Sequence, residues 1–349
     1  MSDKLPEAGI YFGMAEAAYH AVPALSASGI KNLMISPMDY WARSHMNPDY
    51  QPEETDALGL GKAYDCRIVE GRAAFYRLYA PALDSDDHQS ALRTMDDIRQ
   101  AITAAGGKPK GATKAALIDQ LATLDPGAQV WDRLVEQHAG LHDGKTLLAP
   151  KLIRRIEIAA AMIEKHPELC KAFTGGYPQV SIFWVDEETG VPMKSRLDYL
   201  KVRAIIDLKT VGNAQGKPFD RAVYYAMASY KYHVQAGVYL EAVEAAKRLI
   251  RAGDMTAVNG AVDAKWLQQF VSANEHSFVF CFQQTGIAPV ARGYQLQRGS
   301  VLQIADLQIR QARETYKRCV ETFGDSPWVD VTPIQPFDDL GFPQFISEG

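Results

Sequence analysis

Residues 179–211 hold three consecutive segments whose side chains alternate in the way that β-strands require. QVSIFWVD and VPMKSRLDYLKV are joined by the turn EETG, which predicts a β-hairpin, and RAIIDLKTV follows as a third strand. No other stretch restricts the fold as strongly, because helical patterns surround these strands on both sides in the sequence. We therefore expect an α/β protein with a central sheet flanked by helices.

Helical patterns before and after these strands complete the expected chain. Ser26 or Ser28 caps a helix that runs to Ile35, and Pro37 begins a second short helix. The remaining predictions are helices over about 61–69, 150–171, 219–249 and 303–323, two strands (SFVFCFQQ and GIAPVARGYQL) and an extended tail, SPWVDVTPIQPFDDLGFPQF.

Residues 84–145 differ in being polar, alanine-rich and helical. MDDIRQAITAAGG ends in two glycines, and Thr113 is a suitable N-cap for the helix that follows. We predict a helix–loop–helix inserted in the main fold, which divides the chain into 1–83 (first part of the core), 84–145 (insertion) and 146–349 (main part of the core). The insertion is similar to SAP-like DNA-binding modules. Its lysines contact DNA phosphates or are simply solvated: Lys108, Lys110 and Lys114.

Composition excludes several classes of protein. The 349 residues carry a net charge of −5, so any DNA-binding surface must be a local concentration of positive charge. No run of about 18 apolar residues predicts a membrane span, and the N-terminus lacks the pattern of a secretory signal. The four cysteines are far apart, which argues against zinc or iron–sulfur sites and favours a cytoplasmic protein with free thiols.

Charged side chains occur on neighbouring predicted strands. Lys194, Arg196 and Asp198 share one face of the second strand, and Asp207 and Lys209 share one face of the third. Two charged residues on one face are unusual in an otherwise apolar strand. If the two strands pair, we expect Asp198, Asp207 and Lys209 to converge at one edge of the sheet.

This set of groups suits phosphodiester hydrolysis. Two carboxylates, with the backbone carbonyl of Leu208 as a further ligand, would hold magnesium, and manganese could replace it. Lys209 would orient or deprotonate the attacking water. The spacing D-x8-D-x-K also arises by chance, and an Asp–Lys pair is more often a surface ion pair.

The helix after these strands offers two more candidates. Gln235 and Tyr239 lie four residues apart and so on one face, where they could contact a phosphate or brace Lys209. Lys194 and Arg196 are our main candidates for contacts with the DNA backbone. Ser28 and Arg43, in the N-terminal helices, are further candidates for DNA contacts, with Tyr40 and Trp41 stacking at the DNA end or packing in the core.

Together these segments resemble the exonuclease VIII (RecE) family, in the RecB-type branch of PD-(D/E)xK nucleases. The resemblance rests on LSASGIKNLMISPMDY, LGLGKAYDCRIVEG, VSIFWVDEETGVPMKSRLDYL, IIDLKT and YKYHVQAGVYL, in family order. It implies a restriction-endonuclease-like core and a phage or prophage 5′-to-3′ exonuclease that acts on the ends of double-stranded DNA. A ring-shaped homo-oligomer and a RecT-like annealing protein as partner are further implications.

Two positions depart from the family pattern. Asp65 stands where the family usually has a histidine, and the resemblance makes it a metal ligand; Gln179 replaces an acidic residue. Two alternatives to the exonuclease therefore stay open. One is a structure-specific endonuclease of the same fold, and the other is a non-catalytic protein that binds DNA ends in recombination.

Overall fold

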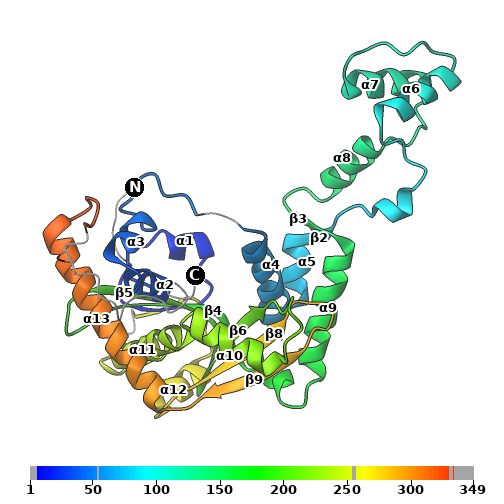
Figure 1. Cartoon of the computed structure of the whole chain (residues 1–349). Helices are drawn as coiled ribbons and strands as arrows, with labels where there is room; N and C mark the ends of the chain where they lie inside the picture. The colour runs from blue at the N-terminus through cyan, green and yellow to red at the C-terminus, as the bar shows by residue number, and fades with distance from the viewer. Residues whose placement is uncertain (1–5, 53–54, 254–256, 330–332, 334–349) are drawn as a thin grey trace, which may run out of the picture.

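The computed structural model describes residues 6–52, 55–253, 257–329 and 333 (Figure 1). Within these residues, seven strands form one mixed sheet in the order β7-β1-β4-β5-β6-β8-β9. The pairs β1–β7 and β6–β8 are parallel, and the other neighbours are antiparallel. The strand bounds are β1 Gly9–Tyr11, β4 Gly176–Val185, β5 Pro192–Lys201, β6 Ala204–Val211, β7 Val258–Asn259, β8 Ser277–Gln284 and β9 Ala291–Leu296.

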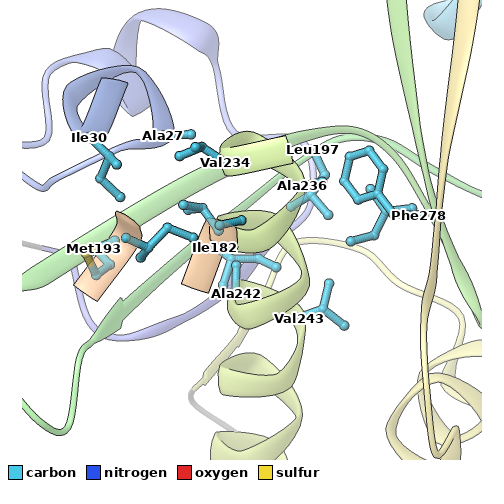
Figure 2. Close-up of a cluster of buried hydrophobic side chains, with 14 of the residues drawn as sticks. Ala27, Ile30, Ile182, Met193, Leu197, Val234, Ala236, Ala242, Val243 and Phe278 are labelled. Atoms are coloured by element: carbon cyan, nitrogen blue, oxygen red, sulfur yellow. The ribbon is translucent and has the colours of Figure 1, made fainter. Parts of the chain in front are cut away.

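The larger core fills one face of the sheet. Ile182, Met193 and Leu197 of the hairpin pack there against Val234 and Ala242 of α11, as Figure 2 shows. Burying such side chains contributes about 1.5–3 kcal/mol each, so this packing fixes α11 against the strands. The helices that build this side are α2 Ala27–Leu33, α3 Pro37–Ala42, α10 Phe219–Ser229, α11 Tyr232–Arg251, α12 Ala264–Ser272 and α13 Ser300–Phe323.

A second core covers the opposite face. Ile156 and Ala159 belong to the same buried cluster as Tyr199, Ile206 and Leu208 of β5 and β6. Because Ile206 and Leu208 alternate with Asp207, this packing turns the Asp207 side chain toward the α11 side. The elements on this face are α4 Asp56–Asp65, the π-helix η1 Cys66–Glu70, α5 Arg72–Leu78, α9 Pro150–Lys165 and the 3₁₀ turn η3 Leu169–Lys171.

The insertion extends away from the sheet beyond α5 and α9 (Figure 1). It leaves and rejoins the core through a two-stranded parallel sheet, in which Tyr79 pairs with Thr146 and Pro81 with Leu148. It has its own small core, built from Ile98, Ile102, Leu117, Ile118, Leu121 and Val130. The two connecting strands are β2 Tyr79–Pro81 and β3 Thr146–Leu148, and the elements of the insertion itself are η2 Ser85–His88, α6 Met95–Ala104, α7 Lys114–Leu124 and α8 Trp131–Leu141.

Local signals place several elements where the sequence predicts them. Ser26 Oγ accepts the N–H of Gly29 and caps α2, and Thr113 caps α7 in the same way. Pro37 is the first residue of α3, where its missing N–H costs nothing. The hairpin, the strand with Asp207 and Lys209, and the two later strands are present as predicted. α1 Glu16–His20, α8, α12, β1 and β7 were not predicted.

Three predicted helices differ from the structure. The expected helix over 219–249 is two helices, because Lys231 adopts a left-handed conformation (φ 49°) between α10 and α11. No glycine or proline announces this break. The helix expected over about 61–69 begins earlier, where Thr55 caps α4, and widens into a π-helix after Asp65. The helix expected over 150–171 ends at Lys165.

The C-terminal tail lies largely outside the described residues, so its predicted extended course is not described here. At the start of the tail, Trp328 is fully buried against Tyr40, with ring centroids 5.1 Å apart. In the described part of the chain, no helix combines the length and apolarity needed to span a membrane.

Candidate active site

The site lies where β5 and β6 separate. Their register includes the pairs Leu200–Ile205 and Tyr199–Ile206 and goes no further. One residue beyond, Asp198 Oδ2 accepts the backbone N–H of Leu208 at 2.8 Å. The Asp198 side chain thus replaces the backbone acceptor that a neighbouring strand would otherwise offer to Leu208. The gap between the strands opens at Asp198 and Asp207.

Asp207 is completely buried on β6. Its Oδ1 accepts a hydrogen bond from Gln235 Nε2 of α11 at 2.9 Å, and its Oδ2 forms an ion pair with Lys209 Nζ. Tyr239 lies one turn further along α11, near enough for its phenol to interact with both Gln235 and the charge of Asp207. The structure therefore brings the two predicted residues of α11 to the site, but Gln235 contacts Asp207 and not Lys209, which it was expected to brace.

Lys209 lies between negative charge and an aromatic ring. Its Nζ is 5.1 Å from the ring centroid of Tyr232, and Lys31 Nζ of α2 lies 5.4 Å from the same centroid. Neither Lys31 nor Tyr232 was identified from the sequence. Both lie inside the segments quoted for the family resemblance, but a lysine on a short helix and a tyrosine among several give no signal of their own.

A second polar chain approaches from α4. Asp65 Oδ2 accepts Gln179 Nε2 at 2.8 Å, and Gln179 Oε1 accepts Arg196 Nε at 3.0 Å. Gln179 lies between the paired residues Pro178–Tyr199 and Val180–Leu197, and so opposite Asp198. Its backbone is left-handed (φ 52°), which is a strained conformation for a residue with a side chain. Gln179, which stands where the family has an acidic residue, thus links Asp65 to Arg196.

Burial and crowding of negative charge dominate the electrostatics. Burial, then the charges of Asp207 and Asp65, hold the pKa of Asp198 well above its usual range. Burial and the charge of Glu70 raise the pKa of Asp65 to about 7. Burial alone would lower the pKa of Lys209, but the charges of Asp207 and Asp198 outweigh it and raise that pKa above its usual value. The site thus has an excess of carboxylates over the cations that neutralise them.

The groups around this opening fit a hard divalent cation. Asp198 and Asp207 supply carboxylate oxygens, and Asp207 Oδ2 is buried without a hydrogen bond of normal geometry. The Leu208 carbonyl, between Asp207 and Lys209, is a further oxygen of the same kind. Within the described ranges, however, no three His, Cys, Asp or Glu side chains are placed to hold one ion. The expected metal ligands Asp65, Asp198 and Asp207 therefore do not form one set. Asp65 instead accepts a hydrogen bond from Gln179.

Two of the residues expected to contact DNA are engaged within the protein. Lys194 is buried, and its Nζ donates to the carbonyl oxygens of Tyr19, His20 and Val22. The predicted contact between Lys194 and a DNA phosphate is therefore wrong. Arg196 is half-buried and also donates to Met14 O at 2.9 Å. Its position beside Gln179 makes it a part of the site's framework.

The other predicted DNA contacts lie on the surface. Arg43 forms an exposed ion pair with Asp39, and Ser28 Oγ lies 3.0 Å from Ser26 Oγ at the start of α2. In the insertion, Lys114 pairs with Asp132 of α8. Lys108 and Lys110 lie on the exposed loop between α6 and α7, which Gln120 fixes through Lys108 O and Lys110 N. Tyr40 is a core residue, and Trp41 donates to Asp325 O.

Comparison with known proteins places this geometry in context. Residues 129–257, which contain Asp198, Asp207, Lys209, Gln235 and Tyr239, match the model of a family described as a PDDEXK-like domain of unknown function (DUF3799). The core has the PD-(D/E)xK fold. This confirms the predicted fold class, a mixed central sheet flanked by helices.

The solved structures that align with the chain include one described as "Putative exonuclease" from Eubacterium rectale. It is 16% identical, with a TM-score of 0.46, and the alignment covers 91% of this chain and 93% of that one. No curated protein matches the sequence.

Proposed function

We propose that this protein is a divalent-metal-dependent exodeoxyribonuclease of the RecE-like branch, which degrades linear double-stranded DNA from its 5′ ends and leaves 3′ single strands. The observation that supports the proposal most is the opening between β5 and β6. There Asp198, Asp207 and Lys209 lie around one buried position, with Gln235 bonded to Asp207. These groups are the ones that hydrolysis of a phosphodiester requires.

Each residue has a distinct task in this proposal. Asp198 and Asp207 hold the cation, which would polarise the phosphate and activate a water molecule. Lys209, paired with Asp207, orients or deprotonates the attacking water and stabilises negative charge on the phosphoryl oxygens. Gln235 fixes the rotamer of Asp207. In the reaction, water adds to phosphorus and one P–O ester bond breaks.

The wider assembly belongs to the same proposal. In a ring of identical subunits, the locally positive surfaces of several chains would surround one duplex. A single chain with a net charge of −5 would bind the duplex less well through its own positive surface. The 3′ strand would then pass to an annealing protein of the RecT type. The phage or prophage origin and magnesium as the metal, with manganese able to replace it, are expectations that follow from the same resemblance.

A digestion assay tests the proposal. Purified protein with Mg²⁺ should release nucleotides from linear duplex labelled at its 5′ end and spare a closed circle. Asp207→Asn keeps an oxygen to accept from Gln235 but loses the charge that holds the cation, so turnover should fall by about 10³-fold or more. Cleavage of the circle would favour the endonuclease alternative. Binding of DNA ends without release of nucleotides would favour the non-catalytic one.

A further inference from the structure

A groove lined with tyrosines begins at the residue that follows Lys209. It is a cavity of 270 Å³ between the end of β6, the loop after it and α10. Among the described residues that line it, none is acidic. They are Thr210, Val211, Gly212, Asn213, Ala214, Gln215, Lys217, Ala222, Tyr225, Ala226, Ser229 and Tyr230. The groove therefore adjoins the proposed catalytic centre and is electrostatically open to an anion.

Aromatic rings continue from the catalytic lysine into this groove. Tyr232, over which Lys209 Nζ lies, stacks on Tyr230 with centroids 5.6 Å apart and planes 29° apart. Tyr230 is 62% exposed and Tyr225 is 52% exposed. Lys231, which separates the two rings in the sequence, has a left-handed backbone conformation. Two exposed rings at the mouth of a cavity contribute little to the core of the protein.

Cations accompany the rings. Lys217 Nζ lies 4.8 Å from the ring centroid of Tyr225, and the Arg221 guanidinium lies 5.8 Å from it on the same side of α10. Both side chains are exposed. Exposed aromatic rings beside lysine and arginine are the combination that binds single-stranded nucleic acid, where bases stack on the rings and phosphates meet the cations.

We propose that this groove binds unpaired nucleotides of the strand that is being cut, with bases against Tyr225 and Tyr230 and phosphates against Lys217 and Arg221. The inference rests on the proposed nuclease function, because it assigns the groove to the substrate of the same site. A cavity of 270 Å³ is small even for a drug-sized ligand, so its size suits unpaired nucleotides and not a duplex.

Tyr224 provides a matched control on the same helix. It is 67% exposed, but it lies on the other side of α10, where it contacts the ring of Tyr294 at 6.3 Å and lines a different, apolar cavity. Replacing Tyr224 removes one exposed tyrosine ring from the same surface helix as Tyr225. It leaves the groove unchanged.

The test measures binding of a fluorescent oligothymidylate of about 12 nucleotides in EDTA, where no cleavage occurs. The double variant Tyr225→Leu/Tyr230→Leu should weaken binding roughly tenfold or more, because each base–ring stack is worth about 1–3 kcal/mol. Tyr225→Phe/Tyr230→Phe should bind like the wild type, since it keeps both rings. Tyr224→Leu should also bind like the wild type, and thermal unfolding of each variant checks its fold.

Three outcomes would overturn the inference: no binding by the wild type, equal binding by the leucine double variant, or an equal loss in Tyr224→Leu. The result is separate from that of the digestion assay. A protein that binds through the two rings but never cleaves DNA would refute the nuclease and keep the groove. A protein that cleaves linear duplex but binds oligothymidylate equally well without the two rings would support the nuclease and refute the groove.

Discussion

Lys209 carries the most specific chemical expectation at the scale of single residues. Its ammonium is the cation paired with Asp207, and it is only 14% exposed. Lys209→Gln should lower kcat by about 10²- to 10³-fold, because a fixed positive charge no longer meets the negative charge that develops on the phosphoryl oxygens. Mg²⁺ affinity should be kept or increased, since a competing cation has been removed.

Calorimetry of Mg²⁺ binding, run beside the digestion assay, separates these two effects. Asp198→Asn is the matched variant, which should weaken Mg²⁺ binding while leaving the thermal unfolding temperature near that of the wild type. A Lys209→Gln protein that turns over as fast as the wild type would remove Lys209 from the mechanism.

His276 gives a prediction about pH that is independent of the active site. It is 2% exposed, and burial followed by the charge of Lys247 lowers its pKa from 6.5 to about 4. Between these values the unfolded chain binds the proton and the folded chain does not. The stabilisation from neutral His276 is therefore complete above pH 6.5 and is lost as the pH falls toward 4.

The loss between pH 7 and pH 5 amounts to about 2 kcal/mol of the free energy of unfolding. His276→Gln, which cannot titrate, should show a smaller decrease over this interval than the wild type in urea unfolding at each pH. Identical pH profiles for the two proteins would mean that His276 is not the group responsible.

Lys231 determines the joint between α10 and α11 at the scale of secondary structure. A left-handed conformation costs a residue with a Cβ about 1–2 kcal/mol, and glycine avoids most of that cost. Lys231→Gly should raise the free energy of unfolding by about 0.5–1 kcal/mol, and Lys231→Val should lower it by about 1 kcal/mol. Lys231→Gln keeps the backbone cost and removes only the charge, so it should unfold like the wild type.

Urea unfolding measures all three variants. A destabilised glycine variant would show that the lysine side chain contributes more than its backbone conformation costs.

Elements that depend on local signals were predictable from the sequence, and those that depend on distant contacts were not. The strand with Asp207 and Lys209 follows from its own alternation, and α2 and α7 follow from their caps. The break at Lys231 has no local signal, because it is the packing of Val234 and Ala236 in the core and the bond from Gln235 to Asp207 that position α11. Tertiary contacts override helix propensity there.

The same distinction holds for the site. Spacing along two strands identified Asp198, Asp207 and Lys209 as neighbours. Burial of Lys194 beneath three carbonyl groups could not be predicted, because those carbonyls come from the end of α1 and the turn after it, about 170 residues earlier in the chain. For the same reason, the bond from Gln179 to Asp65, between residues 114 positions apart, left no trace in the sequence.

At the scale of the whole molecule, we expect the insertion to be separable from the core. Its apolar cluster shares no residue with the two cores of the sheet, and its bonds to the core include His138 Nε2 to Pro81 O and Lys145 Nζ to Tyr76 O. A linker that replaces residues 83–145 must run back along two parallel three-residue strands, about 10 Å. Six Gly and Ser residues span about 13 Å, so the shortened chain should fold.

If Lys108 and Lys110 contact phosphates, the shortened protein should bind duplex DNA with a weaker dependence on salt. Each lost phosphate contact reduces the slope of log K against log salt by about 0.9, so two contacts reduce it by about 2. Lys108→Gln/Lys110→Gln in the full chain should reproduce that change, because Gln120 holds the loop through backbone atoms that the substitutions keep. Equal slopes in all three proteins would mean that the insertion leaves DNA untouched, and its role would then lie in contacts between proteins.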